Sequence, residues 1–204
     1  MAISTYDELL SAVNEFTERE YGSTQLDMFL ALWESALNRR LGPDYRRTTT
    51  GTLTTDANGE ASLPTGFVAM RSIVQDISGS KPLKQVTWSA LIDGNPYFLA
   101  DNPVWFAIQG STLKVSPIKA DTFNLTYDAK LTGLSSSNTS NWLLAAAPDV
   151  YFWGVMAQAT GYEENWAVAG AQEARAYDLL ADLVGQGNVA QFGDAEMQPD
   201  TVMP

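Results

Sequence analysis

Apolar residues recur at helical spacing at both ends of the chain and at alternating, strand-like spacing between them. Four stretches carry the helical pattern, at residues 6–16, 26–41, 150–160 and 166–184. Each of these stretches has an apolar face with no partner inside its own segment. We therefore expect an α+β fold, in which helices from both ends pack into one helical unit around an inserted β region.

Local signals mark the limits of the two N-terminal helices. Thr5, with Glu8 three residues later, forms a capping box before the first helix. Thr24 is expected to cap the second helix, and Gly42-Pro43 is expected to end it. The residues expected to face inward are Tyr6, Leu9, Leu10, Val13 and Phe16 in the first helix and Leu26, Phe29, Leu30, Trp33, Leu37 and Leu41 in the second.

The two C-terminal helices have similar limits. Pro148 suits the first position of the third helix, where a missing amide hydrogen costs nothing. Gly185 is expected to end the fourth helix. The residues expected to face inward are Tyr151, Phe152, Val155, Met156 and Ala159 in the third helix and Trp166, Ala169, Ala176, Tyr177, Leu180, Leu183 and Val184 in the fourth.

The middle of the chain predicts an antiparallel β-meander or small sandwich. Asn58-Gly59 and Gly110-Ser111 are both signals for a tight two-residue hairpin turn. The links between successive alternating segments are short, whereas parallel pairs need long crossovers. The predicted division is a helical unit of residues 1–44 and 142–186, a β region of residues 45–141 and an extended C-terminal arm of residues 187–204.

The C-terminal arm has no periodic pattern, and its apolar residues are too scattered to form a core of their own. A segment of this kind orders on binding. It either folds back as an intramolecular strap or docks on a neighbouring molecule, and we predict docking. Its candidate contacts are Val189, Phe192, Met197, Val202 and Met203.

The 204 residues include no cysteine and no histidine. Disulfides, thiolate nucleophiles, Ser-His-Asp triads and histidine-ligated metals are therefore excluded. Carboxylate, lysine and tyrosine chemistry stays open, but no motif selects it, so we predict no enzyme activity, catalytic residue, metal or cofactor. Asp56–Glu60 faintly resembles part of a calcium loop, and a hairpin turn is the preferred interpretation. No segment is long and apolar enough to predict a membrane span or a signal peptide.

Charge along the chain is uneven. The formal net charge is −12, which repels nucleic acid at long range. A basic cluster, RRLGPDYRR, nevertheless places Arg39, Arg40, Arg46 and Arg47 close together. The first two arginines are favoured at a helix C-terminus by the helix dipole. The cluster otherwise fits acidic groups of a neighbouring copy or DNA phosphates, and in so acidic a chain we favour the neighbouring copy.

The order of these segments resembles that of the tailed-phage head-to-tail connector, or adaptor, proteins, including the tail tubular protein A type of short-tailed phages. The resemblance covers most of the chain from Thr5 to about Gly185. The segments that carry it are YDELLSAVNEF, TDANGEASLPTGFVAM, FAIQGSTLKVSP running on to LTYDAKL, and APDVYFWGVMAQATGYEENWAVAGAQEARAY.

This resemblance implies a structural virion protein of the phage neck, assembled in the host cytoplasm. Identical copies, commonly twelve, would form a ring under the portal protein, extend the DNA channel and provide a platform for the tail or nozzle. DNA would pass without sequence-specific binding, and no membrane would be involved. Two alternatives stay open: a carbohydrate- or receptor-binding module of a phage tail, suggested by the six tryptophans, and a carboxylate-dependent enzyme.

Overall fold

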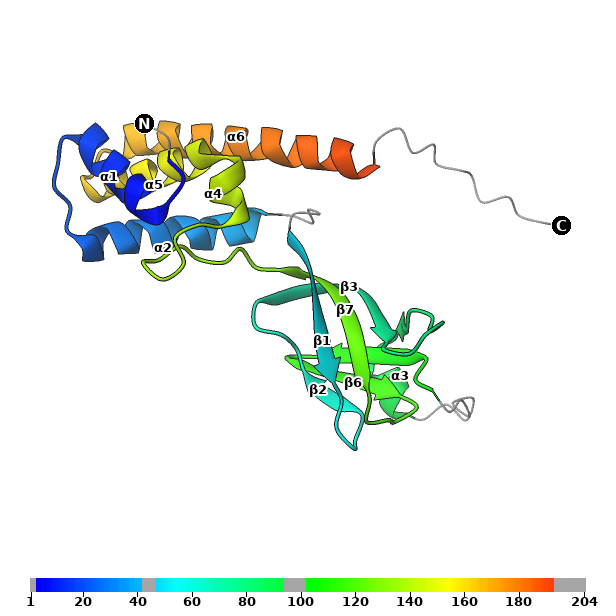
Figure 1. Ribbon diagram of the computed structural model, residues 1–204. Helices are drawn as coiled ribbons and strands as arrows, with labels where there is room; N and C mark the ends of the chain where they lie inside the picture. The colour runs from blue at the N-terminus through cyan, green and yellow to red at the C-terminus, as the bar shows by residue number, and fades with distance from the viewer. Residues whose placement is uncertain (1–2, 42–46, 94–101, 193–204) are drawn as a thin grey trace. The chain divides into compact units, whose positions relative to one another are not determined.

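The computed structural model describes residues 3–41, 47–93 and 102–192, with residues 187–192 described by their backbone alone (Figure 1). The chain divides into two compact units. The helical unit combines both ends of the chain, Met1–Arg46 with Leu131–Pro204, and the β unit is Arg47–Lys130. The α+β class expected from the sequence is confirmed.

The helices of the helical unit are α1 (Tyr6–Thr17), α2 (Ser23–Arg40), α4 (Trp142–Ala146), α5 (Pro148–Tyr162) and α6 (Trp166–Phe192).

The start of each N-terminal helix is set by side chains that bond to its first amides. The predicted capping box is confirmed, because the Glu8 amide donates to Thr5 Oγ1 and the Thr5 amide donates to Glu8 Oε2. Thr24 is not the cap of α2: Gly22 precedes the helix, and its amide donates to Gln25 Oε1 at 3.1 Å.

One hydrophobic core joins the helices from the two ends of the chain. The stripe predicted for α2 is confirmed in full, with Trp33 entirely buried. Pro148 occupies the first turn of α5, as predicted. Helix α5 packs against α1, α2, α4 and α6 and so forms the centre of the unit.

Three further expectations for the helices are wrong. Phe16 is 59% exposed, because it packs by its edge on Phe152 and Trp153 and leaves its other side open. Trp166 is 72% exposed, because it is the first residue of α6 and lies beside the α5–α6 turn. Gly185 does not end α6, whose backbone stays helical to Phe192. A solvent-exposed glycine weakens a helix without breaking it, and no proline follows before Pro199.

The segment between the β unit and α4 is anchored to α2. The Leu131 amide donates to Asn38 Oδ1 at 2.9 Å, and the Leu134 amide donates to Glu34 Oε1 at 2.8 Å. Tyr151 Oη also donates to Glu34 Oε1, at 3.1 Å. These bonds place residues 131–141 in the helical unit, whereas the sequence pattern assigns them to the β region.

The stability of this anchor is expected to depend on pH through Glu34. Burial raises the pKa of the Glu34 carboxyl above its ordinary value of 4.5. The Glu34 side chain therefore makes its full contribution to the stability of the folded state below pH 4.5. This contribution is lost as the pH rises through the folded-state pKa of Glu34. The free energy of unfolding of Glu34→Gln, minus that of the wild type, should therefore be larger near neutral pH than under acid conditions.

Urea unfolding at a series of pH values tests this expectation. The exposed variant Glu15→Gln is a control for the same change in net charge. If the free energies of unfolding of the wild type and of Glu34→Gln differ by the same amount at every pH in the acid range, the role assigned to Glu34 is wrong.

The β unit contains two sheets that share one hydrophobic core. The first has the order β1-β7-β3, and the second has the order β2-β6-β5-β4. Strand β7 lies between two antiparallel partners, and short β4 pairs with β5 in parallel. The elements are β1 (Thr48–Thr54), β2 (Glu60–Ser62), β3 (Phe67–Gln75), β4 (Lys84–Gln85), α3 (Trp88–Ile92), β5 (Trp105–Gln109), β6 (Thr112–Ser116) and β7 (Thr122–Ala129).

The two predicted turns have different surroundings. Gly110-Ser111 joins β5 to β6, with Gln109 opposite Thr112, and this hairpin is confirmed. Asn58-Gly59 also lies in a tight turn, with Gly59 at φ +73°. Its flanking strands, however, pair with β7 and β6 instead of with each other. The hairpin predicted there is therefore wrong, and the turn is the corner at which the chain passes from one sheet to the other.

Replacing Gly59 by valine is expected to destabilise the β unit by about 1–3 kcal/mol. The backbone is in the left-handed region, and an added Cβ would lie 3.2 Å from the Val115 carbonyl oxygen. A β-branched residue is strained in that conformation. Thermal unfolding measures the effect, and Gly79→Val is the matched control, since Gly79 has φ +81° but no atom within 4 Å of an added Cβ. A Gly59→Val loss no larger than that of the control would show that the packing around Gly59 is unimportant.

Candidate subunit-docking surface

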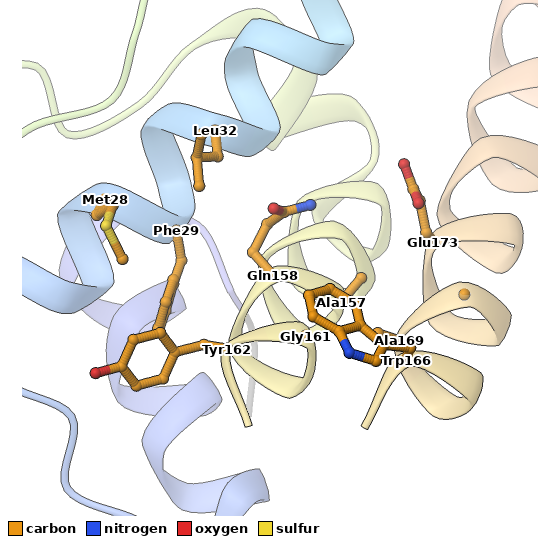
Figure 2. A pocket seen from close by; sticks show the side chains of 11 residues that line it. Met28, Phe29, Leu32, Ala157, Gln158, Gly161, Tyr162, Trp166, Ala169 and Glu173 are labelled. Carbon is orange, nitrogen blue, oxygen red and sulfur yellow. The ribbon is translucent and has the colours of Figure 1, made fainter. Parts of the chain in front are cut away.

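A groove of about 390 Å³ lies on the helical unit, between α2 and α6 and above α5. Figure 2 shows side chains from all three helices converging on it. Small residues form its floor, among them Ala157 and Gly161 of α5. Its remaining lining residues are Met28, Phe29, Leu32, Gln158, Tyr162, Trp166, Ala169, Gly170 and Glu173.

The floor of this groove lies close to the Trp166 side chain. A Cβ on Gly161 would lie 3.4 Å from Trp166 Cζ3 and 3.8 Å from Ala169 Cβ. The Trp166 indole therefore lies close to α5 at residue 161 (Figure 2). Farther along the helices, the ring centroids of Trp33 and Tyr177 are 5.3 Å apart, and this contact brings α2 and α6 together. The groove is therefore open beside the first turns of α6.

The walls of the groove are apolar and accessible. Met28 is 44% exposed, Leu32 52%, Tyr162 56% and Trp166 72%. Met28 and Leu32 are four residues apart and so share one face of α2. Monomeric proteins rarely expose a large continuous apolar surface unless it binds something. We define these four residues, with the groove between them, as the docking groove.

Polar contacts fix the end of the helical unit beside the docking groove. Gln25 Nε2 donates to Tyr162 Oη at 3.4 Å. Tyr21 donates its hydroxyl hydrogen to Glu163, which also accepts from Arg19 Nε at 2.7 Å. Burial, followed by the bond to Glu163, raises the pKa of Tyr21 to about 12. These two tyrosines and the paired carboxylate hold the α5–α6 corner.

The four predicted arginine contacts do not form a single described cluster. Arg39 donates to Ser35 Oγ at 2.9 Å, and the Arg40 guanidinium lies 4.2 Å from the centre of the Tyr177 ring. Arg47 is buried in the β unit, where its Nε donates to the Ala129 carbonyl at 3.1 Å. Arg46 lies outside the described residues. Contacts from Arg39 and Arg40 to a neighbour stay a prediction.

The predicted contacts of the C-terminal arm fall mostly beyond the described side chains. Val189 and Phe192 belong to the last turns of α6, so residues 187–192 are helical and not extended as the sequence suggested. Met197, Val202 and Met203 lie outside the described residues. The role of the arm in binding stays a prediction.

Residues with possible acid–base or metal chemistry have structural partners in the β unit. The Asp56 carboxylate accepts from the amides of Asn58 and Glu60 at 2.9 and 2.8 Å, and these bonds, with that to Glu60 foremost, lower its pKa. This arrangement confirms that Asp56–Glu60 forms a turn, although not the hairpin turn that the sequence predicts. Among the described residues, no group of acidic side chains is arranged to hold a metal ion. Within the same ranges, no helix is both long and apolar enough to span a bilayer.

The docking groove was not predicted from the sequence. The sequence pattern assigns Trp166 to the core and gives no signal at Met28 and Leu32. The available signal is the run of small residues on α5 and α6, from Ala157 and Gly161 to Ala169 and Gly170. Such residues permit close approach of a partner, but they are equally suited to packing within one chain.

Comparison with known proteins identifies the family. One family model, described as SU10 adaptor protein, matches residues 4–202. No curated protein matches the chain. The matched region covers the helical unit, the β unit and the segment beyond α6, and it confirms the resemblance found in the order of the sequence segments. The chain therefore belongs to the SU10 adaptor protein family, a family of phage head-to-tail adaptors.

Proposed function

We propose that this chain forms a ring of identical copies on the portal protein in the neck of the phage particle. The ring extends the DNA channel and carries the attachment platform for the tail or nozzle. Twelve copies match the ring implied by the resemblance to adaptors. Assembly takes place in the host cytoplasm, and the chain acts as a structural component and not as an enzyme.

The docking groove is the observation that carries this proposal within the adaptor family. It offers an accessible apolar surface on a rigid three-helix support, as a subunit interface requires. The net charge of −12 supports the second part of the proposal. A protein that neutralised DNA phosphates would hold DNA in the channel, whereas an acidic one lets it pass.

Binding to portal rings tests the proposed function. The purified chain should co-sediment with portal rings of the phage that encodes it and not with portal rings of an unrelated phage. A parallel titration of tryptophan fluorescence against a glycan panel tests the carbohydrate-binding alternative, since sugars that stack on Trp166 would change its emission. Glycan binding without portal binding would overturn the adaptor proposal.

The C-terminal arm is proposed to bind the portal, with an adjacent copy as the second choice of partner. Deleting residues 193–204 leaves α6 and every described core residue of the helical unit in place. The truncated chain should therefore keep its far-UV circular dichroism and thermal stability. It should bind portal rings at least about tenfold more weakly, because a segment that orders on binding contributes its contacts only in the complex.

Sedimentation with portal rings measures this loss, and circular dichroism controls for folding. Portal binding that is unchanged by the deletion would show that residues 193–204 are dispensable for binding. Weaker binding accompanied by loss of helical signal would instead assign residues 193–204 to the fold.

A further inference from the structure

A second exposed apolar surface lies on the helical unit, at the packing of α1 on α5. It surrounds a hollow of about 420 Å³ whose lining includes Ile3, Ala12, Phe16 and Phe152. Phe16 is its most prominent side chain, with 59% of its surface exposed. The Phe16 ring meets the Phe152 ring edge-on, with centroids 5.4 Å apart, so it is held in place while its free side faces solvent. We define Phe16 and Phe152, with this hollow, as the Phe16 patch.

The Phe16 patch and the docking groove occupy different sides of α5. Phe152 belongs to the patch, and Gly161 belongs to the floor of the groove. These residues are about two and a half helical turns apart, so they lie on opposite faces of the helix. One copy therefore presents two different apolar surfaces in two directions. This is the arrangement that a head-to-tail interface needs, and such interfaces form rings when the rotation between neighbouring copies closes.

Charged side chains flank both apolar surfaces, and acidic residues line each of them: Glu15 and Glu18 at the Phe16 patch and Glu173 at the docking groove. On α2, the exposed stripe that begins at the groove continues from Leu32 through Ser35 to Arg39, with Arg39 bonded to Ser35. The acidic residues of the Phe16 patch are therefore attracted to the α2 end of the groove, where Arg39 lies, and repelled from its α6 wall, where Glu173 lies. Opposite potentials of this kind favour one orientation of docking.

We propose that the Phe16 patch of one copy binds the docking groove of the next copy around the ring. This inference rests on the proposed function and specifies how its subunits meet. Phe16 enters the groove between α2 and α6, where the floor of small residues leaves room for an aromatic ring. Glu15 or Glu18 approaches Arg39 of the neighbouring copy. The Met28, Leu32 and Trp166 side chains are then covered from solvent.

Site-specific crosslinking tests the pairing directly, because the chain has no native cysteine. The double variant Phe16→Cys/Leu32→Cys is assembled on portal rings and treated with a short bis-maleimide. It should give a ladder of covalently linked copies that ends in a closed ring. The matched control Phe16→Cys/Ile118→Cys replaces the groove position by a residue of the β unit that is 60% exposed. The yield of linked copies should exceed that of the control by about tenfold or more.

Charge reversal supplies a second readout that does not require cysteines. Arg39→Glu should weaken assembly, and the combination of Arg39→Glu with Glu15→Arg and Glu18→Arg should restore at least part of it. Both variants are changed only at exposed residues, so folding should persist.

The outcomes separate this inference from the proposed function. Assembly of wild-type chains on portal rings, without specific crosslinks and without charge-reversal rescue, overturns the pairing and leaves the adaptor role intact. Failure of the wild-type chain to assemble on its portal overturns the proposed function and the pairing with it. Specific crosslinks together with rescue support both.

Discussion

Replacing Gly154 by alanine is expected to unfold the helical unit or to destabilise it by about 3 kcal/mol or more. A Cβ at residue 154 would lie 1.9 Å from Trp33 Cε2 and 2.2 Å from Trp33 Cδ2. The Trp33 side chain is completely buried among α2, α5 and α6, so it has no space into which to move. One added methyl group must therefore push α2 away from α5.

Urea unfolding of the variant measures this loss. Gly170→Ala is the matched control, because Gly170 is also helical but an added Cβ there meets no atom within 4 Å. That substitution should leave stability unchanged or raise it by about 0.5–1 kcal/mol. Equal stability of the Gly154→Ala and Gly170→Ala proteins would contradict the close packing of Trp33 on α5.

Replacing Phe123 by alanine is expected to destabilise the β unit by about 3–5 kcal/mol. Phe123 is fully buried on β7 and belongs to a core that receives side chains from both sheets. Its removal leaves a cavity that the surrounding strands cannot fill. Since the helical core contains different residues, the loss should be concentrated in residues 47–130.

Amide hydrogen exchange distinguishes the two units after this substitution. Protection should fall in β1, β3 and β7, and it should be largely retained in α2 and α5. Val68→Ala is the control, because Val68 is 45% exposed and should change stability little. An equal loss of protection in both units would show that they unfold as one cooperative body.

The helical unit was largely predictable because its signals are local. The capping box at Thr5 and the apolar stripe around Trp33 follow from spacings of three and four residues, and both are present. Phe16 and Trp166 fit the same spacing but lie at helix ends, where the periodic pattern does not specify whether a neighbouring helix covers the side chain. Burial at such positions depends on tertiary packing, which a single sequence does not contain.

The sheet arrangement was predictable only in part, for the same reason. Gly110-Ser111 gives its hairpin because the paired strands are adjacent in the sequence. The pairing of β1 with β7 joins residues about 70 positions apart and has no local signal. Asn58-Gly59 supplies the same local turn whether its strands pair together or diverge into two sheets. The docking groove likewise depends on three helices meeting, so its residues could not be grouped beforehand.

The most direct test of the adaptor account is native mass measurement of the chain mixed with portal rings of its own phage. The account predicts one dominant complex, whose mass equals one portal ring plus a fixed number of adaptor copies, twelve on a twelvefold portal. Free chains should remain when portal rings are saturated. Complexes with a broad, concentration-dependent range of copy numbers, or portal rings that carry no adaptor, would contradict it.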